Sequence, residues 1–478
     1  MRINTNILSS RLETIWPRRK TLALITLPFL LGALLALSII KFGLITLPVV
    51  LTLLIALPWF VKAPYRLFIW LVITWPILTL YIRVPLPAGI PDLTYERVLI
   101  LLLLGIVVVE AALFKRQLMK VTPLDILVMC YVIAQMSSRL FVLWFGGLGE
   151  PDLDGFVNIV LIPVALYWLV KNLLVTKQQL FWFLNAFVIG CLLICFTGLY
   201  EQAVGQKLFF VSASLGGTEL PYEWQDIVGM RASGALINPA IYGATLGMGI
   251  LTGFACLPYI KRKLLQVTFV AISLILIFGV FASYTRSAWV SVFSVLFIAQ
   301  FLINKMWHKT LPIIGLAIPL LALLWSLIPQ SSAILSRAMT IDTINTRFNL
   351  IILGWEKFLE KPILGWGSGA LHNFGLTYLR LNSHNTYLTL LVDGGFFLFL
   401  SFLAVVVYVI IRAYYIFKLS AKSSFERSAL VAAIGCTLIF LLSGLALELR
   451  IFSYFNALLW IFIGIIDHLG EIIGQEHA

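Results

Sequence analysis

Residues 264–282 read LLQVTFVAISLILIFGVFA, a run without a single charged side chain. A helix of roughly 20 apolar residues spans the hydrocarbon core of a bilayer, which is about 30 Å thick. The apolar residues are continuous here, whereas a membrane strand alternates apolar with polar positions. The stretch therefore predicts a transmembrane helix.

Runs of this kind recur from residue 21 to residue 466 of the 478-residue chain. Hydrophobic residues make up 61% of the sequence and charged residues 12%, whereas a soluble domain is nearer half apolar and a quarter charged. The predicted fold class is all-α, a polytopic membrane protein with about fourteen transmembrane helices. The expected spans are residues 21–40, 44–61, 67–82, 98–114, 124–145, 156–170, 180–203, 236–259, 264–282, 287–303, 311–328, 385–411, 428–447 and 451–466.

The sequence predicts one transmembrane helical domain, residues 21–466, between a cytoplasmic segment at 1–20 and a cytoplasmic tail at 467–478. Two connections, residues 204–235 and 329–384, are longer than turns, and connections of that length are usually functional. The second contains TRFNLIILGWEKFLEKPILGWGSG, with apolar residues at helical spacing before a proline and a glycine-rich stop. We expect a helix along the membrane surface in this loop.

The basic residues indicate the orientation of the spans. If the N-terminus is cytoplasmic, alternate connections place most of the 34 Lys and Arg residues on the cytoplasmic side. Acids such as Glu150, Asp152 and Asp154 then gather on the opposite side, with both long loops. Both termini are therefore predicted to be cytoplasmic. The formal charge of +13 would lie largely against anionic membrane lipids, so a nucleic-acid partner is not expected.

The sequence contains no recognisable metal or cofactor motif. All five cysteines lie in apolar runs, which indicates core packing rather than disulfides. The five histidines form no HExxH pattern and accompany no paired cysteines or acid-rich ligand set. GWGSG at 365–369 follows no strand and lacks the Walker lysine, so it predicts a helix stop and turn. We expect neither a metal nor a cofactor.

Three polar positions lie at the outer mouths of expected spans: Arg231 in MRASGALINPAIYG, Arg286 in SYTRSAWVSV and His384 in LNSHNTYLTLLVDGG. Arginine at that depth is costly unless it is paired or wetted, and it opposes the charge rule on the outer side. Its planar fork binds phosphate oxygens bidentately, so two arginines could hold a diphosphate without a metal. A neutral imidazole, whose ordinary pKa is about 6.5, can take a proton from a hydroxyl.

Simpler roles exist for each of these residues. An arginine at a span end can extend to the interface, and a histidine can hydrogen-bond a loop carbonyl. Asp393 lies nearly inside a span and is either a helix-packing acid or part of the site. It is left out of the predicted site.

At these residues the sequence resembles the O-antigen ligase and O-antigen polymerase family, inner-membrane glycosyltransferases that use undecaprenyl-diphosphate-linked glycans. The resemblance covers roughly residues 225–410. Three patterns of the family are found in this chain. The first is an arginine followed by small residues and Asn-Pro, and the second is a polar residue directly before an arginine. The third is an arginine at the start of an outer helix, followed by Trp, Pro and Gly. The matching residues are Arg231, Gly234, Asn238 and Pro239; Thr285 and Arg286; and Arg347, Trp355, Pro362, Gly365 and Gly367.

The fourth block is the most specific: His-Asn, nine residues, then Gly, met by His384, Asn385 and Gly395. The family often has a second glycine three residues later, where this chain has Leu398. The resemblance implies that the arginines bind the donor diphosphate and that His384 activates the acceptor. Arg347 joins the site only through the resemblance.

Together these features predict a metal-independent, inverting glycosyltransferase of the bacterial inner membrane with its active site on the periplasmic face. The resemblance implies an undecaprenyl-diphosphate-linked glycan as donor and a glycan or lipid-linked hydroxyl as acceptor, in O-antigen or exopolysaccharide biosynthesis. We favour a polymerase, with a chain-length regulator as partner, because the expected frame is larger than a minimal ligase needs. A ligase to lipid A core or protein stays open. A polysaccharide or lipid flippase would need ionisable residues or broken helices near the bilayer midplane, and a structural scaffold would leave the outer Arg and His residues without a shared pocket.

Overall fold

The computed structural model describes residues 62–84, 86–87, 90–114, 118–145, 153–205, 231–302, 342–370, 385–421 and 424–477. The chain divides into two compact units, Met1–Leu67 and Phe68–Ala478, and the packing and the site described below belong to the second.

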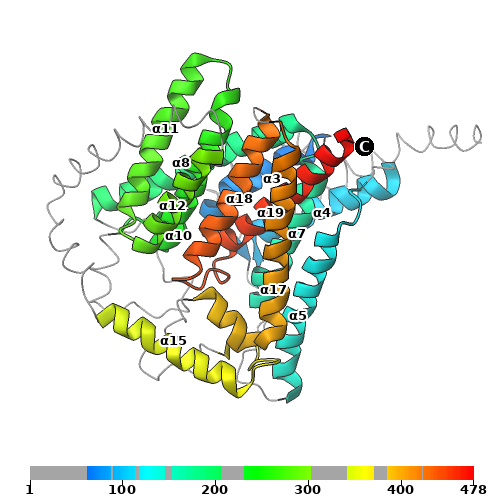
Figure 1. The fold of residues 1–478 in the computed structure, drawn as a ribbon, viewed down its shortest axis with the longest axis vertical. Helices are drawn as coiled ribbons and strands as arrows, with labels where there is room; N and C mark the ends of the chain where they lie inside the picture. The colour runs from blue at the N-terminus through cyan, green and yellow to red at the C-terminus, as the bar shows by residue number, and fades with distance from the viewer. Residues whose placement is uncertain are drawn as a thin grey trace, which may run out of the picture. The chain divides into compact units, whose positions relative to one another are not determined.

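The described residues are almost entirely helical, which confirms the all-α class (Figure 1). The helices are α3 (Pro64–Leu78), α4 (Tyr95–Phe114), α5 (Pro123–Phe145), α6 (Leu153–Phe156), α7 (Ile162–Leu173), α8 (Lys177–Val204), α10 (Pro239–Cys256), α11 (Lys263–Ala282), α12 (Arg286–Leu302), α15 (Asp342–Glu360), α17 (Thr386–Leu419), α18 (Phe425–Ser443) and α19 (Ser453–His477). Shorter turns are the π-helical η2 (Val157–Leu161) and the 3-10 helices η4 (Gly234–Leu236) and η5 (Leu257–Tyr259). The strands β1 (Arg83–Val84) and β2 (Leu93–Thr94) form one antiparallel pair.

The expected spans that fall within the described residues all coincide with helices. Residues 264–282, for example, correspond to α11 (Lys263–Ala282). Among the described residues, 7 helices are long and apolar enough to cross a membrane, and α3 and α12 are apolar but shorter. The expected spans 21–40, 44–61 and 311–328 lie outside the described residues, so the number of fourteen stays a prediction. The same holds for the division of the chain at residues 20 and 466, although α19 runs on to His477 without a break.

Helix α10 is the most deeply buried helix of the site region. It packs against α8, α11, α12 and α18, and nearly all of its residues are buried. Its glycines permit this, because a Cβ at Gly247 would collide with Val292 of α12 and one at Gly249 with Cys191 of α8. Small residues let helix backbones approach closely in a membrane.

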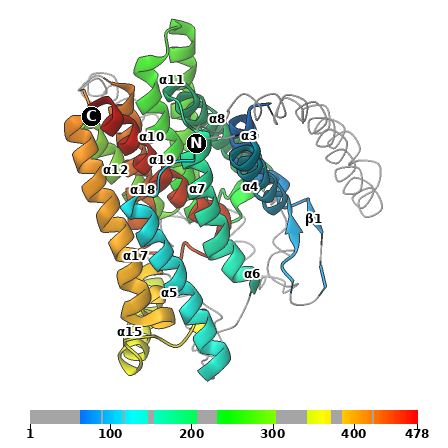
Figure 2. The ribbon, with the colours of Figure 1, turned by 90° about the vertical axis from the view of Figure 1, so that its right-hand side faces the viewer.

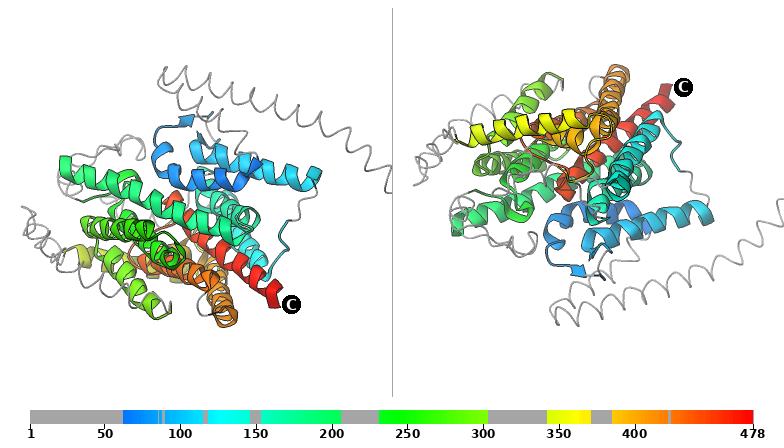
Figure 3. Two further views of the ribbon diagram at one scale, coloured as in Figure 1. Left: turned by 90° about the horizontal axis from the view of Figure 1, so that it is seen from above. Right: turned by 90° about the horizontal axis from the view of Figure 1, so that it is seen from below.

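Helix α19 packs against α7 and α18 (Figure 3), and α5 and α17 run side by side (Figure 2). Polar side chains of α19 donate hydrogen bonds to backbone carbonyls of α3 and η2, two helices with irregular backbone hydrogen bonding. Pro76 has no N–H, and the carbonyl of Val72, four residues earlier, accepts from the Tyr454 hydroxyl (3.1 Å). Within η2, the Ile159 carbonyl accepts from the Asn456 amide (2.9 Å). Such pairing is required where no water reaches the backbone.

The cysteines are free, and four of them are buried as packing residues: Cys191, Cys195, Cys256 and Cys436. Cys130 is different, because it lies exposed on α5 beside exposed Met129 and Ile133. The prediction of core packing is therefore wrong for Cys130. The outward, apolar face of α5 suits lipid contact instead.

Orientation in the membrane stays a prediction, and cysteine labelling tests it. In a Cys130→Ala background, the remaining native thiols are buried. We expect Ser214→Cys and Ser332→Cys, in the two long loops, to react with an impermeant thiol reagent in intact cells. Arg262→Cys should react only after permeabilisation. The reverse pattern would invert the topology and remove the outer-face site.

Candidate active site

Arg231 is exposed, and the turn that follows it is hydrogen-bonded to the end of α8. The backbone N–H of Gly234 donates to the Glu201 carboxylate (2.8 Å) near the end of α8, and the Ser233 hydroxyl lies 3.3 Å from the same oxygen. Glu201 is buried. Sequence reasoning missed this residue, although an acid near the end of an apolar span is a signal of a buried partner.

The Asn-Pro pair after Arg231 begins α10. The Asn238 side chain accepts from the N–H groups of Ala240 (2.9 Å) and Ile241 (3.3 Å), and Pro239 occupies the first helical position. Asparagine is a preferred N-cap, and proline suits the first position because its missing N–H would be unpaired there. The Asn-Pro block therefore serves to start a helix.

Arg286 is the first residue of α12 and is exposed. The preceding turn contains Tyr284 at a φ of 44°, and the Ala282 carbonyl in that region accepts from the Ala232 N–H (3.0 Å). Ala232 directly follows Arg231. The backbones that carry the two arginines are thus hydrogen-bonded to each other, although 55 residues separate Arg231 from Arg286 in the sequence.

His384 lies outside the described residues, but Asn385, its neighbour in the His-Asn pattern, is the N-cap of α17. The Asn385 side chain accepts from the N–H groups of Tyr387 (2.9 Å) and Leu388 (3.0 Å). Helix α17 therefore begins directly after the Asn385 of the His-Asn pair.

The start of α17 is connected to the start of α12 through the end of α18. The Thr386 N–H donates to the Gly444 carbonyl (2.8 Å). The hydroxyls of Ser443 and Ser291 lie 2.9 Å apart, and Ser291 is in the second turn of α12 after Arg286. The starts of α12 and α17 are therefore linked through the end of α18, and the bond between Ala232 and Ala282 links the chain before α10 to the chain before α12. Helix N-termini present unpaired N–H groups and partial positive charge, which favours an anion there.

Helix α15 lies where the sequence predicted a helix within residues 329–384, whereas the assignment of this stretch to an outer loop stays a prediction. It carries Arg347, whose side chain is not described, so its role stays a prediction. The helix packs on α17, where Phe358, Leu388 and Val392 form a small apolar cluster. Leu388 fits closely against Gly354, where a Cβ would lie 2.5 Å from its Cδ2. Its place along the membrane surface stays a prediction.

After α15 the chain makes the expected glycine-rich stop and turn, with Gly365, Gly367 and Gly369 at positive φ. The turn also makes contacts with α17 that the sequence did not predict. The N–H groups of Trp366 and Gly367 donate to the carbonyls of Val392 (2.8 Å) and Asp393 (2.9 Å) in α17. The turn therefore docks on the backbone of α17.

Docking is made possible by a break in α17 at Gly395, which adopts a φ of 61° and a ψ of −160°. The first segment of α17, residues 386–394, bends away from the long second segment (Figure 1). The Phe396 N–H beyond the break donates to the Pro362 carbonyl (2.7 Å). A Cβ at residue 395 would collide with the Ile363 carbonyl. The expected continuous span at 385–411 is thus two segments, and the glycine of the His-Asn block is the break.

We expect Gly395→Ala to destabilise the protein. The positive φ alone costs an L-residue ~1–3 kcal/mol, and the collision with Ile363 adds to it. Thermal unfolding of the purified protein measures the change. Gly105→Ala in α4 is the matched control, because a Cβ there meets nothing within 4 Å and alanine is the better helix former. Equal melting temperatures for the two variants would contradict the assignment of Gly395 as an obligatory break.

Among the described residues, no group of three or more His, Cys, Asp and Glu side chains is placed to hold a metal ion. The backbones that carry Arg231 and Arg286 are hydrogen-bonded to each other, and the start of α17 is linked to α12 through the end of α18. The side chains of His384, His372 and Arg347 lie outside what it describes.

The fold is that of a multi-pass helical membrane protein with two arginines on turns that are hydrogen-bonded to each other. Residues 243–403 match the family model of the O-antigen ligases, which confirms the resemblance to the O-antigen ligase and polymerase family. The matched segment includes Arg286, Arg347, His384 and Gly395, whereas Arg231 precedes it. No curated protein matches the chain.

Proposed function

We propose that this protein is a glycosyltransferase that moves a glycan from undecaprenyl diphosphate to a hydroxyl of a second glycan, without a metal. The family match supports membrane glycosyl transfer in general. The observation that carries the proposal is the hydrogen bond between Ala232 and Ala282, because it joins the turns of Arg231 and Arg286.

The two arginines would bind the donor diphosphate. Each guanidinium keeps its charge and offers paired N–H donors, and the N-termini of α10 and α12 add partial positive charge. As the bond between the anomeric carbon and the diphosphate oxygen breaks, its electron pair leaves with the diphosphate. Charge develops on that oxygen, and preorganised donors stabilise it most where water is excluded.

His384 would act as the general base. Its neutral imidazole takes the proton from the acceptor hydroxyl while the hydroxyl oxygen attacks the anomeric carbon from the side opposite the diphosphate. One C–O bond forms as another breaks, so the anomeric configuration inverts. Arg347, on α15, is assigned to the same diphosphate by its place in the family pattern.

We further propose that the protein acts as a polymerase at the periplasmic face of a bacterial inner membrane. A ligase to lipid A core or protein would use the same residues with another acceptor. Surface polysaccharide from a deletion strain separates the two on a gel. A missing ladder with a single capped unit indicates a polymerase, whereas unattached lipid-linked polymer indicates a ligase.

A further inference from the structure

Three charged residues form a buried cluster beside the proposed site: Asp393 in α17, and Glu448 and Arg450 in the loop between α18 and α19. Each is at most 5% exposed. The Arg450 side chain donates from Nε to Glu448 Oε1 (2.9 Å) and lies 3.6 Å from Asp393 Oδ2. The Asp393 carbonyl also accepts from the Ser138 hydroxyl of α5 (2.8 Å). The cluster thus joins three parts of the fold.

The same loop holds the other end of the first segment of α17. The Thr386 hydroxyl donates to the Leu447 carbonyl (2.8 Å), and the Leu449 N–H donates back to that hydroxyl (3.0 Å). The Thr386 N–H is bound by Gly444, as described above. Segment 386–394 is therefore tied at its first residue by backbone and hydroxyl bonds, and near its last residue by the ion pair of Asp393.

A contribution to packing does not explain why the buried residues Asp393, Glu448 and Arg450 are charged. Removing carboxylates and a guanidinium from water is costly, and apolar residues of similar volume often stabilise a fold as well or better. Apolar contacts, however, have no direction. The Arg450 guanidinium, fixed by its hydrogen bond to Glu448, sets a positive charge 3.6 Å from Asp393, and this favours one rotation of segment 386–394 about its own axis.

We propose that Asp393, Glu448 and Arg450 are positioning residues that hold segment 386–394, which follows His384 in the chain, in the orientation needed for transfer. This inference rests on the proposed function, since His384 precedes the segment by two residues. A displacement of about 1 Å in a reacting group can cost on the order of a hundredfold in rate. Small rotations of the segment should therefore affect chemistry more than donor binding.

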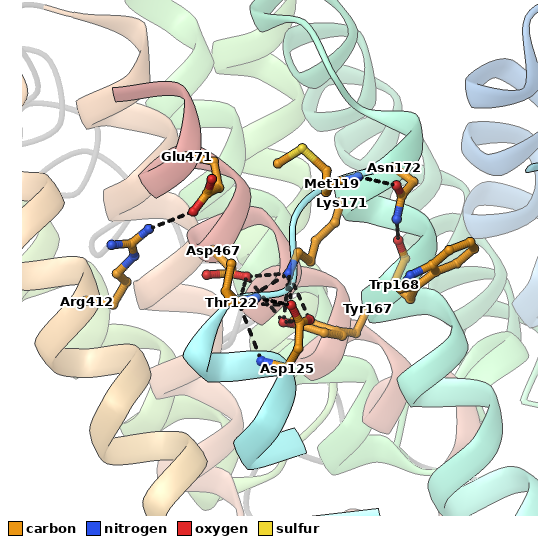
Figure 4. A network of polar contacts seen from close by, with 10 residues as sticks. All are labelled: Met119, Thr122, Asp125, Tyr167, Trp168, Lys171, Asn172, Arg412, Asp467 and Glu471. Carbon is orange, nitrogen blue, oxygen red and sulfur yellow. Dashed lines mark hydrogen bonds and ion pairs between the residues drawn. The ribbon is translucent and has the colours of Figure 1, made fainter. Parts of the chain in front are cut away.

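A second buried charge cluster provides a matched control (Figure 4). Lys171 Nζ lies 2.7 Å from Asp125 Oδ2 and 2.7 Å from Asp467 Oδ2, with the Tyr167 hydroxyl close by. Lys171 is 2% exposed and lies in the last turn of α7. Asp467 lies 14 residues into α19, roughly 21 Å along the axis from the helix start that Arg450 precedes. This cluster is therefore remote from the proposed site.

The test compares two variants in which each cluster is replaced by neutral residues of similar size. The site variant is Asp393→Asn, Glu448→Gln, Arg450→Gln; the control is Asp125→Asn, Lys171→Gln, Asp467→Asn. We measure thermal unfolding, amide hydrogen exchange of residues 386–394, and kcat and donor KM in lipid nanodiscs. In the site variant alone, exchange should rise about tenfold or more, and kcat should fall about 10- to 100-fold with donor KM within about threefold.

Unchanged exchange in residues 386–394 of the site variant, or an unchanged kcat, overturns the proposal. A parallel loss of kcat and donor affinity in both variants also overturns it, because that pattern reports general destabilisation. If the site variant does not fold, Arg450→Lys is measured in its place. Lysine keeps the charge but lacks the planar guanidinium, so exchange and kcat should change in the same direction by a smaller factor. Hydrogen exchange needs no substrate. If the site variant exchanges faster but the wild-type protein transfers no glycan, the proposed function is rejected. The conclusion that the three residues hold segment 386–394 is then retained.

Discussion

Replacing His384 by Gln should lower glycan transfer by about a hundred- to ten-thousand-fold, the usual cost of losing a general base. Glutamine keeps the approximate size and part of the hydrogen bonding of histidine, but it cannot accept the proton of the acceptor hydroxyl. The start of α17 is capped by Asn385 and bound by Gly444, so the variant should fold. Purified His384→Gln should therefore bind the lipid-linked donor as the wild type does, yet transfer poorly.

His372→Gln is the matched control, because His372 lies in the same long loop and should not contact the acceptor. It should keep wild-type activity. The catalytic assignment is wrong if His384→Gln transfers glycan at the wild-type rate, or if His372 is the essential residue, even with the family correctly identified.

The same assignment gives a sign for the pH dependence. The base acts only as the neutral imidazole, so turnover should fall as pH drops through the pKa of His384, ordinarily about 6.5. It should level off above that pKa. The measurement is kcat against pH under donor saturation, with chemistry limiting the rate. A kcat that rises as the pH is lowered through this range would require another base.

Arg286→Ala should reduce kcat by about a hundred- to a thousandfold, the cost of removing one preorganised donor from a developing oxyanion. Arg286→Lys should stay impaired although it keeps the charge, because lysine cannot bind phosphate oxygens bidentately. Arg231 should behave in the same way, since its turn is hydrogen-bonded to that of Arg286. Transfer assays with purified variants measure both effects.

Arg262→Ala, in the short connection before α11, is the control for loss of an exposed arginine and should leave transfer unchanged. Wild-type turnover in Arg286→Ala removes this residue from the mechanism. Chelation of divalent cations should change the rate little, and a strict metal requirement would count against arginines in place of a metal.

Much of the local structure follows from short stretches of sequence. The apolar run at 264–282 became α11 (Lys263–Ala282), because a segment in lipid must pair its backbone within itself. Asn238 and Asn385 cap helices through bonds to residues two and three positions later, and the stop after Glu360 needs only nearby proline and glycines. These features depend on neighbours along the chain, and the sequence alone was enough to predict the helices and the stop.

The break at Gly395, the anchoring of the Arg231 turn by Glu201 and the ion pair between Asp393 and Arg450 were decided only in the folded chain. Each depends on a partner distant in sequence: the turn after α15, the end of α8 and the loop before α19. A continuous apolar run has the same composition whether its helix is broken or straight. Gly395 becomes a break because the carbonyls of Pro362 and Ile363 occupy the space of a side chain, and that approach arises from tertiary packing.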